Sequence, residues 1–357
     1  MKLSCYSYKL PFSEPLQTSG QTFQHRKGFI LSYTTEKHQL YGEVAPLPGF
    51  STESHKSVQK ILTSNHDTIS KKLAHSYTVS KLYEFYQDED IPPSVQFGLD
   101  TLAYQIEARN NKQSLLSYLF ADASPKILVN ALISLQGNDV LKDVADKVAS
   151  RFNTVKCKIG LNFEEELGLL NKIKSKYSDL TIRVDANQAW DLDEAIDHCN
   201  KLNKLDIEYC EEPLNEITPA NLEQLSKNTS LPLALDESMT QHSYWPNLLP
   251  FTNYLIIKPM VIGSFQKNIE TKRLANTHNN KVVITSSLES SVGRYFTGLM
   301  AAGLGSPNKA HGLSTGFLLV KDIFPEKHVI SEGSIDLSAR HLPTINFDQQ
   351  QFFTKLF

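Results

Sequence analysis

Five short clusters of charged and amide side chains follow one another between residues 156 and 259 of the 357-residue sequence. In chain order they read KCK at residues 156–158, DAN at 185–187, EEP at 211–213, DES at 236–238 and KP at 258–259. Each cluster ends a short apolar run, where a buried strand does not favour charge. If these runs are the strands of a parallel barrel, the charges converge at its mouth, where barrel enzymes place their active sites.

Side-chain alternation along a strand predicts which of these residues share a face. Successive residues point to opposite faces, so Lys156 and Lys158 share one face. By the same reasoning Arg183, Asp185 and Asn187 share a face of the next strand. We expect both sets to point into the barrel.

The EEP and DES clusters leave an open question, because only one member of each acidic pair can point inward. The pairs are Glu211 with Glu212, and Asp236 with Glu237. Three inward carboxylates on adjacent strands would repel one another and need a compensating cation. With oxygen donors alone, such a site suits Mg²⁺, with Mn²⁺ as a substitute. The alternative is a ring of salt bridges between the carboxylates and the neighbouring lysines.

Lysines flank the acidic clusters on both sides of the predicted strand order. Lys156 and Lys158 precede the acids, and Lys258 follows them. A lysine close to other cations and to a metal has a lowered pKa, which suits a general base near neutral pH. A metal with flanking lysines therefore predicts abstraction of a proton next to a carboxylate. For KCK, two surface lysines that lay their stems along the protein are the alternative.

The apolar runs alternate with helical stretches at a repeat of about 22 to 28 residues, which predicts βαβ units and a parallel sheet. The runs lie at residues 127–132, 155–159, 181–184, 207–210, 232–235, 254–257 and 282–284, with a weaker eighth at 312–320. So regular a count favours a (β/α)₈ barrel over a doubly wound sheet. The region before it is mixed, with a strand at the start, a second near residues 29–33 and helical text at 55–86.

Two further segments belong to this arrangement. Residues 93–108 begin with Pro and carry apolar residues at helical spacing, so we expect a helix at the joint of two domains. Residues 42–54 contain two prolines and two glycines and predict a loop. We expect this loop to close as a lid over the mouth, with Phe50 and Ser51 at the substrate; a plain surface turn is the alternative. Ser286 and Ser287 end the seventh run and are expected to line the substrate pocket.

Composition limits the partners. Net charge is −3, which argues against nucleic acid or an anionic membrane as the main partner. The sequence has no apolar run of about 18 residues and no signal-peptide pattern at its start. Four cysteines without CxxC spacing predict a reduced, cytoplasmic protein. We expect a small-molecule substrate; a homo-oligomer is compatible with the sequence, which does not define the number of subunits.

Taken in this order, KCKIG, RVDANQAW, EEP, DES and IIKP resemble the muconate-lactonizing branch of the enolase superfamily. GEVAPLPGFSTES and TSSLESSVG resemble the o-succinylbenzoate synthases of that branch. The resemblance covers nearly the whole chain. It implies an enolase-like α/β fold, a modified (β/α)₈ barrel of the form (β/α)₇β with an α+β capping domain. The domains would be a cap at 1–95, the barrel at 96–316 and a segment at 317–357 that returns to the cap.

The resemblance also implies a role for each charged residue. The ligands of Mg²⁺ would be Asp185, Glu211 and Asp236. The catalytic lysines would be Lys158 as the base, Lys156 beside it and Lys258 on the opposite face of the substrate. Asn187 and Glu237 would lie behind the ligands. We further expect Arg183 near the succinyl carboxylate of the substrate, directly or through water.

The implied reaction is the Mg²⁺-dependent dehydration of 2-succinyl-6-hydroxy-2,4-cyclohexadiene-1-carboxylate to 2-succinylbenzoate, in menaquinone biosynthesis. Lys158 would remove the proton alpha to the carboxylate, Mg²⁺ and Lys258 would stabilise the enediolate, and protonated Lys158 would assist the loss of hydroxide. A racemase of N-acylated amino acids or a dipeptide epimerase is the alternative, with Lys158 and Lys258 as opposed acid and base. A non-enzymatic barrel is a third reading, which the retention of every ligand and lysine disfavours.

Overall fold

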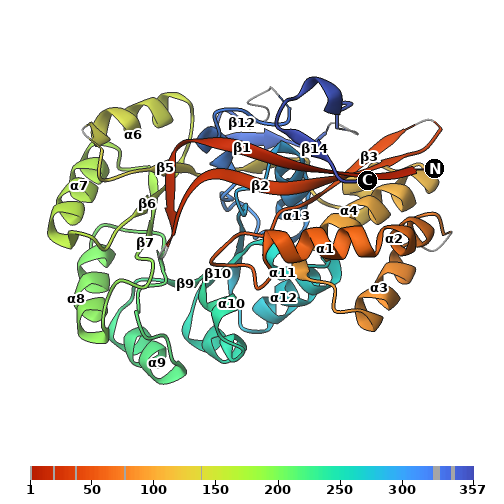
Figure 1. Cartoon of the computed structure of the whole chain (residues 1–357). Helices are drawn as coiled ribbons and strands as arrows, with labels where there is room; N and C mark the ends of the chain where they lie inside the picture. Colours follow the sequence, from red (N-terminus) through yellow and green to blue (C-terminus); the bar gives the residue numbers. More distant parts are fainter. Residues whose placement is uncertain are drawn as a thin grey trace.

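The structure is a computed structural model that describes residues 2–18, 21–36, 38–75, 78–137, 139–324, 330–338 and 342–357. Figure 1 shows an antiparallel sheet with its helices beside a curled parallel sheet that helices surround. This arrangement confirms the predicted α/β class, with an α+β cap on a modified barrel. The limits of the three domains stay predictions. No helix in the described part of the chain has the length and apolar character that a membrane span requires.

The cap is built on a four-stranded antiparallel sheet in the order β14-β1-β2-β3. Its strands are β1 (Lys2–Thr18), β2 (Gln21–Thr34), β3 (Gln39–Val44) and β14 (Phe353–Lys355). The helical text forms three helices, α1 (His55–Ser64), α2 (His66–Leu73) and α3 (Thr78–Asp88). Residues 42–44, which we predicted as loop, instead complete β3, because they pair with β2. β14 pairs with β1, so the end of the chain lies beside its beginning (Figure 1).

The barrel sheet has seven parallel strands in the order β11-β10-β9-β8-β7-β6-β5. They are β5 (Ala131–Ile133), β6 (Thr154–Lys158), β7 (Thr181–Asp185), β8 (Cys210–Glu211), β9 (Leu233–Leu235), β10 (Tyr254–Ile257) and β11 (Lys281–Ile284). The connecting helices are α6 (Val140–Ala149), α7 (Phe163–Lys176), α8 (Leu192–Asn203), α9 (Pro219–Asn228), α10 (Ser238–Gln241), η1 (Trp245–Phe251), α11 (Pro259–Ile262), α12 (Phe265–Thr277) and α13 (Ser291–Leu304). Strand order follows chain order, as repeated βαβ units require.

The first and last predicted strands differ from expectation. The run at 127–132 is split, since β4 (Lys126–Leu128) joins a separate sheet with β13 (Ser334–Asp336) and β12 (Ile330–Ser331), and only β5 enters the barrel. The run at 312–320 contains the 3₁₀ helix η2 (Ser314–Leu318). Its hydroxyl groups bond to neighbouring segments in competition with strand pairing. His311 and Gly312 alone take the eighth place, through parallel bridges to Val129 and Thr285.

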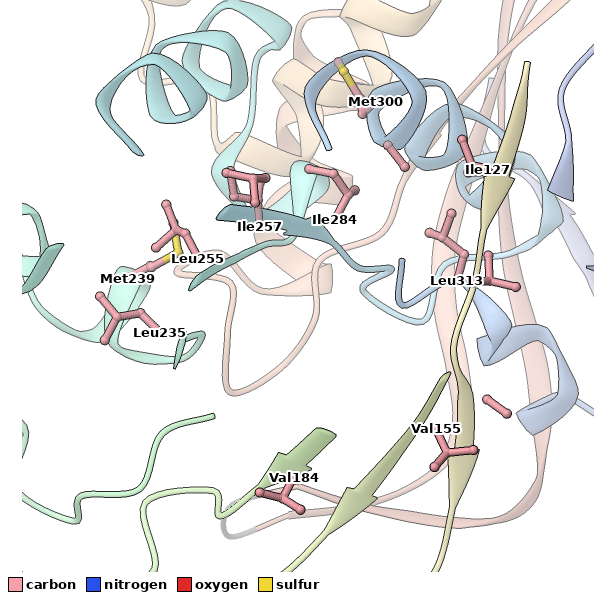
Figure 2. Close-up of a cluster of buried hydrophobic side chains, with 14 of the residues drawn as sticks. Ile127, Val155, Val184, Leu235, Met239, Leu255, Ile257, Ile284, Met300 and Leu313 are labelled. Carbon is pink, nitrogen blue, oxygen red and sulfur yellow. The ribbon is translucent and has the colours of Figure 1, made fainter. Parts of the chain in front are cut away.

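Two layers of side chains alternate along the barrel strands. Figure 2 shows the outer layer, in which strand residues such as Val155, Leu235 and Ile257 pack against helix residues such as Met239 and Met300. The inner layer is a separate buried cluster made of Tyr209, Ala234, Tyr254, Ile256 and Val283. The alternation defines which residues at the strand ends point into the mouth.

The helix α4 (Pro93–Asn110) joins the cap to the barrel, as the sequence predicted. Its Val95 and Leu99 belong to the core of the cap, whereas its Phe97 belongs to the core of the barrel. β3 crosses it closely, because a Cβ on Gly42 would lie 2.1 Å from the Gly98 carbonyl oxygen. Only glycine permits this approach. The remaining short elements are α5 (Leu115–Leu119) and η3 (Phe347–Gln349).

A buried carboxyl group at this joint predicts a dependence of stability on pH. Asp100 of α4 accepts from Tyr86 Oη at 2.8 Å, Tyr83 Oη at 3.3 Å and the Phe265 amide of α12 at 2.7 Å. Burial raises the pKa of Asp100 to about 7, although these hydrogen bonds oppose the shift. Between about pH 4 and 7 the folded chain therefore keeps a proton that the unfolded chain has lost, so stability falls as pH rises, by at most about 1.4 kcal/mol per unit.

We expect Asp100→Asn to remove this part of the dependence, and so to stabilise the protein more at pH 8 than at pH 5. Urea unfolding at the two pH values measures the difference. Asp88→Asn, at the exposed end of α3, is the control and should show the same change in the free energy of unfolding with pH as the wild type. If the free energy of unfolding changed equally between pH 5 and pH 8 in Asp100→Asn and in the wild type, Asp100 would be ionised in the folded protein.

Candidate functional site

The inner layer of the barrel sets the direction of the charged residues at the strand ends. Residues two positions beyond a member of that layer share its face. The residues that follow Tyr209, Ala234 and Ile256 in this way are Glu211, Asp236 and Lys258. The question that alternation left open is thereby answered, since Glu211 and Asp236 point inward rather than Glu212 and Glu237.

Strand register and ion pairs bring the predicted residues together at the mouth of the barrel. In the β6–β7 pair, Lys158 lies opposite Asp185, and in the β7–β8 pair Asp185 lies opposite Glu211. On β9 the register partner of Glu211 is Ala234, so Asp236 lies two residues further toward the mouth. Lys258 follows the last residue of β10 and pairs with Asp236. We call the five residues at the ends of these adjacent strands the mouth row: Lys158, Asp185, Glu211, Asp236 and Lys258. Lys156 lies one layer below it, opposite Arg183.

Two ammonium groups engage the three carboxylates. Lys156 Nζ lies 2.8 Å from Asp185 Oδ2 and also pairs with Glu211, while Lys258 Nζ pairs with Asp236. Burial favours the neutral amine of Lys156, but the attraction of Asp185 and then Glu211 outweighs it and holds the pKa well above its usual value. Lys156 is therefore held as an ammonium ion by its two carboxylate partners.

Glu211 remains undercompensated by these partners. Burial raises its pKa to about 7; Lys156 opposes this shift, while repulsion from Asp185 and Asp236 adds to it. For Asp185 burial acts in the same direction, but Lys156 and Lys158 overcome it and lower the pKa. Asp185 and Glu211 share the single ammonium group of Lys156, so a further cation near Glu211 would stabilise its ionised form.

The donor chemistry of this row fits a hard divalent cation. Asp185, Glu211 and Asp236 are 3%, 1% and 7% exposed and offer only oxygen atoms, as Mg²⁺ prefers. Within the described ranges, no three acidic, His or Cys side chains surround a common point. Lys156 and Lys258 pair instead with oxygens of all three carboxylates. Their ammonium groups act as internal cations among the carboxylates.

Asn187 and Glu237 lie directly behind the acidic row. The backbone N–H of Asn187 donates to Asp185 Oδ1 at 3.1 Å, and its side-chain Nδ2 donates to Glu237 Oε1 at 3.1 Å. Asn187 has φ of 46°, a left-handed conformation that Asn tolerates better than most residues. Glu237 Oε2 finds no donor among the described residues, and burial raises the pKa of Glu237 to about 8.

Glu212 is a functional candidate that the sequence reasoning missed. It is fully buried, and its Oε1 accepts from the amides of Asp236 at 2.6 Å and Ser238 at 3.0 Å. Its Oε2 accepts from Ser238 Oγ at 2.6 Å. Glu212 therefore shapes the turn that carries Asp236. The signal in the sequence was the second acid of EEP, which had to point away from the mouth and needed buried partners of its own.

The loop after β3 reaches the mouth row. The Phe50 ring lies over Lys258, with Nζ 4.3 Å from the ring centroid. Ser51 closes the turn of the loop instead, because its Oγ accepts from the Leu47 amide at 2.9 Å. Arg26, another residue that sequence reasoning missed, ties the base of the loop to the barrel. Its guanidinium donates to the carbonyls of Ala45 at 2.5 Å, Pro46 at 2.7 Å and Leu288 at 3.1 Å.

The serines at the end of β11 differ in their partners. Ser286 Oγ pairs with Thr315 Oγ1 at 2.5 Å, so its hydroxyl is engaged with the segment in the eighth place of the barrel. Ser287 Oγ is buried and finds no partner in the described part of the chain. Contact of Ser286 and Ser287 with a substrate stays a prediction.

Arg183 lies below the mouth row rather than in it. It is 1% exposed, its Nε lies 2.5 Å from Glu208 Oε2, and its Nη1 donates to the Ala310 carbonyl at 2.7 Å. Its guanidinium also stacks on Tyr209, 5.0 Å from the ring centroid. A direct bond from Arg183 to a substrate would compete with these partners. The geometry therefore favours a contact through water.

Leu132 gives the mouth an apolar wall that the sequence did not reveal. It is the strand partner of Lys156, and it is 40% exposed although its neighbours Ala131 and Ile133 are buried in the outer core. An exposed leucine on the inner face of a barrel strand indicates an open space at that level. The alternation of buried and exposed residues in β5 could have revealed it. The first predicted run, at 127–132, had the wrong limits and concealed this pattern.

Comparisons with known proteins place the whole chain in a wider context. The family described as "Enolase C-terminal domain-like" matches residues 139–341, and the family described as "MenC, N-terminal domain" matches residues 1–106. The o-succinylbenzoate synthase of Pasteurella multocida is 26% identical over 97% of this chain and 98% of that protein. The o-succinylbenzoate synthase of Aliivibrio salmonicida is 29% identical over 87% of this chain and 89% of that protein.

Among solved structures, the N-succinyl Arg/Lys racemase of Bacillus cereus has a TM-score of 0.81 and covers both chains completely. At 19% identity this similarity concerns the fold alone. It matches an antiparallel cap on a curled parallel sheet, the arrangement described above.

Proposed function

The chain belongs to the enolase superfamily and is one of its enzymes, and from this premise we propose that it is an o-succinylbenzoate synthase of the cytoplasm. Enzymes of this superfamily act on small carboxylate substrates and typically use a divalent metal. The proposed reaction is the dehydration of 2-succinyl-6-hydroxy-2,4-cyclohexadiene-1-carboxylate to 2-succinylbenzoate. The choice of this reaction is supported by the match of residues 1–106 to the MenC type of N-terminal domain.

One observation of the geometry carries the type of chemistry. Lys158 and Lys258 stand at the two ends of the mouth row, with the carboxylates of three strands between them. A substrate carboxylate in this row would lie between two lysine side chains. Such an arrangement suits removal of a proton from the carbon next to a carboxylate. One lysine can take the proton, and the positive charge of the other can stabilise the negative charge that develops on the carboxylate.

Each lysine has a distinct task in the proposed mechanism. Lys158 is exposed to the mouth, and no hydrogen bond or ion pair of its ammonium group occurs in the described residues. As the free amine it takes the α proton of the substrate. Lys258 offers its ammonium to the oxygens of the substrate carboxylate as they gain charge. Lys156 stays charged and holds Asp185 and Glu211 in place.

The second half of the reaction returns the proton. Protonated Lys158 gives its proton to the departing hydroxyl group, which leaves as water, and the ring becomes aromatic. Mg²⁺ held by Asp185, Glu211 and Asp236 would supply positive charge beside the substrate carboxylate. Leu132 and Phe50 would pack against the carbon ring and exclude water from the mouth.

A racemase or epimerase of N-acylated amino acids is the second candidate. The presence of lysines at both ends of the mouth row favours it, because racemisation needs an acid and a base on opposite faces of the α carbon. Lys158 and Lys258 would then exchange these two tasks.

Complementation tests the proposed function. A menaquinone-producing bacterium that lacks its own o-succinylbenzoate synthase should regain menaquinone when it expresses this chain. The Lys172→Ala variant, on the exposed outer face of α7, is a control for expression and should also complement. If the wild-type chain is expressed and folded but menaquinone stays absent, the proposal fails. Exchange of the α proton of N-succinyl amino acids in D₂O would then support the second candidate.

A further inference from the structure

The main chain turns sharply directly after Lys158, and β7 holds one side of this turn. The Ile159 amide donates to the Asp185 carbonyl at 2.9 Å. Gly160 has φ of +111°, and a Cβ there would lie 2.7 Å from the Ala189 side chain. The turn therefore needs glycine at this position, both for its conformation and for its close approach to the loop that follows β7.

The other side of the turn is held by Glu166, from the first turn of α7. Its carboxylate is only 2% exposed. Oε2 accepts from the Gly160 amide at 2.8 Å, and Oε1 accepts from the Leu161 amide at 3.2 Å and from Gln136 Nε2 at 3.3 Å. No lysine or arginine pairs with Glu166 in the described ranges. Two successive backbone amides thus balance a buried charge, in the manner of an anion-binding nest.

These bonds do not serve the helix itself. Glu164 and Glu165 already place negative charge in the first turn of α7, and both are exposed. The Glu166 carboxylate reaches back to amides that precede the helix. Its contacts therefore stabilise the turn after Lys158 rather than the N-terminus of α7.

Lys158 depends on this turn more than the other two lysines of the site do. Lys156 is held by Asp185 and Glu211, and Lys258 by Asp236. The side chain of Lys158 makes no such ion pair within the described residues and is only attracted by Asp185, so the position of its amine depends mainly on the backbone. A small shift of the turn would move Lys158 Nζ away from the substrate α carbon.

We propose that Glu166 is a positioning residue for Lys158, acting through the amides of Gly160 and Leu161. The proposal rests on the proposed function, in which Lys158 takes the α proton. Glu166 touches neither the substrate nor the reacting atoms. It keeps the amine at the distance and angle that proton transfer requires.

The test compares Glu166→Gln with Glu165→Gln in the full-length chain with Mg²⁺. Both variants remove one negative charge from the same helical turn, but only the first leaves a single acceptor oxygen for two amides. We expect Glu166→Gln to speed hydrogen exchange at Gly160 and Leu161 about tenfold or more, and to lower kcat by about ten- to a hundredfold with KM within about twofold. Glu165→Gln should stay within about twofold of the wild type in all three quantities.

Circular dichroism at the assay temperature must show both variants fully folded, so that a lower kcat reports the bound enzyme and not a smaller folded fraction. Unchanged exchange at Gly160 and Leu161, or faster exchange with an unchanged kcat, overturns the inference. The exchange measurement needs no substrate, so it stands apart from the proposed function. If the wild type acts on N-succinyl amino acids instead, the proposed function fails, and kcat for their α-proton exchange decides the role of Glu166.

Discussion

Replacing Lys158 by alanine is expected to lower kcat for the cyclohexadiene substrate by about 10⁴-fold or more. The reason is that the same amine takes the α proton and then returns it to the departing hydroxyl, and a positioned general acid or base contributes about 10²- to 10⁴-fold. Stability should fall by only about 1 kcal/mol or less, because Lys158 is exposed and makes no hydrogen bond or ion pair in the described part of the structure, although its charge attracts Asp185. Steady-state kinetics and urea unfolding measure the two quantities.

Lys172→Ala is the matched control for this variant. Lys172 lies exposed on α7, on the outside of the barrel, and its loss should change neither kcat nor stability. Retention of more than about one hundredth of the wild-type kcat by Lys158→Ala would rule out its role as the base.

Replacing Lys156 by methionine is expected to lower the free energy of unfolding by about 3 to 5 kcal/mol in the presence of EDTA. Methionine keeps the length of the stem but leaves the buried carboxylates of Asp185 and Glu211 without their shared ammonium group. These carboxylates should then bind a divalent cation more strongly. Mg²⁺ should therefore stabilise Lys156→Met more than it stabilises the wild type, which guanidinium unfolding with and without Mg²⁺ measures.

An exposed ion pair provides the control for this measurement. Lys142 pairs with Asp146 at 2.8 Å on the surface of α6, and Lys142→Met should cost about 1 kcal/mol or less, with no response to Mg²⁺. Equal unfolding midpoints for Lys156→Met and the wild type would contradict the burial of the charge cluster. If Mg²⁺ raised the free energy of unfolding of Lys156→Met and of the wild type by the same amount, the proposed set of Mg²⁺ ligands would be contradicted.

Local pattern was enough to predict the barrel and the neighbourhood of its charges. Apolar runs at a regular repeat predicted the parallel strands, and alternation predicted that Lys156 and Lys158 share a face. The choice between Glu211 and Glu212 needed more, because it depends on which face Tyr209 fills inside the closed sheet. That face is set by contacts with Tyr254 and Val283, from strands far along the chain.

The parts that failed depend on contacts between segments distant in sequence. The eighth place of the barrel could not be predicted, since hydroxyl bonds from Ser286 to Thr315 and from Ser314 to the Asn130 carbonyl replace a strand there. Arg26 and Glu166 went unnoticed, because their partners are backbone groups that no side-chain pattern reveals.

The most direct measurement is the change in ultraviolet absorbance when the purified chain and Mg²⁺ meet 2-succinyl-6-hydroxy-2,4-cyclohexadiene-1-carboxylate. We predict conversion of the diene to 2-succinylbenzoate with a kcat of about 1 s⁻¹ or more, as for typical enzymes, and its loss on addition of EDTA. Absence of conversion by the folded chain, together with α-proton exchange of N-succinyl amino acids in D₂O, would contradict the proposed function.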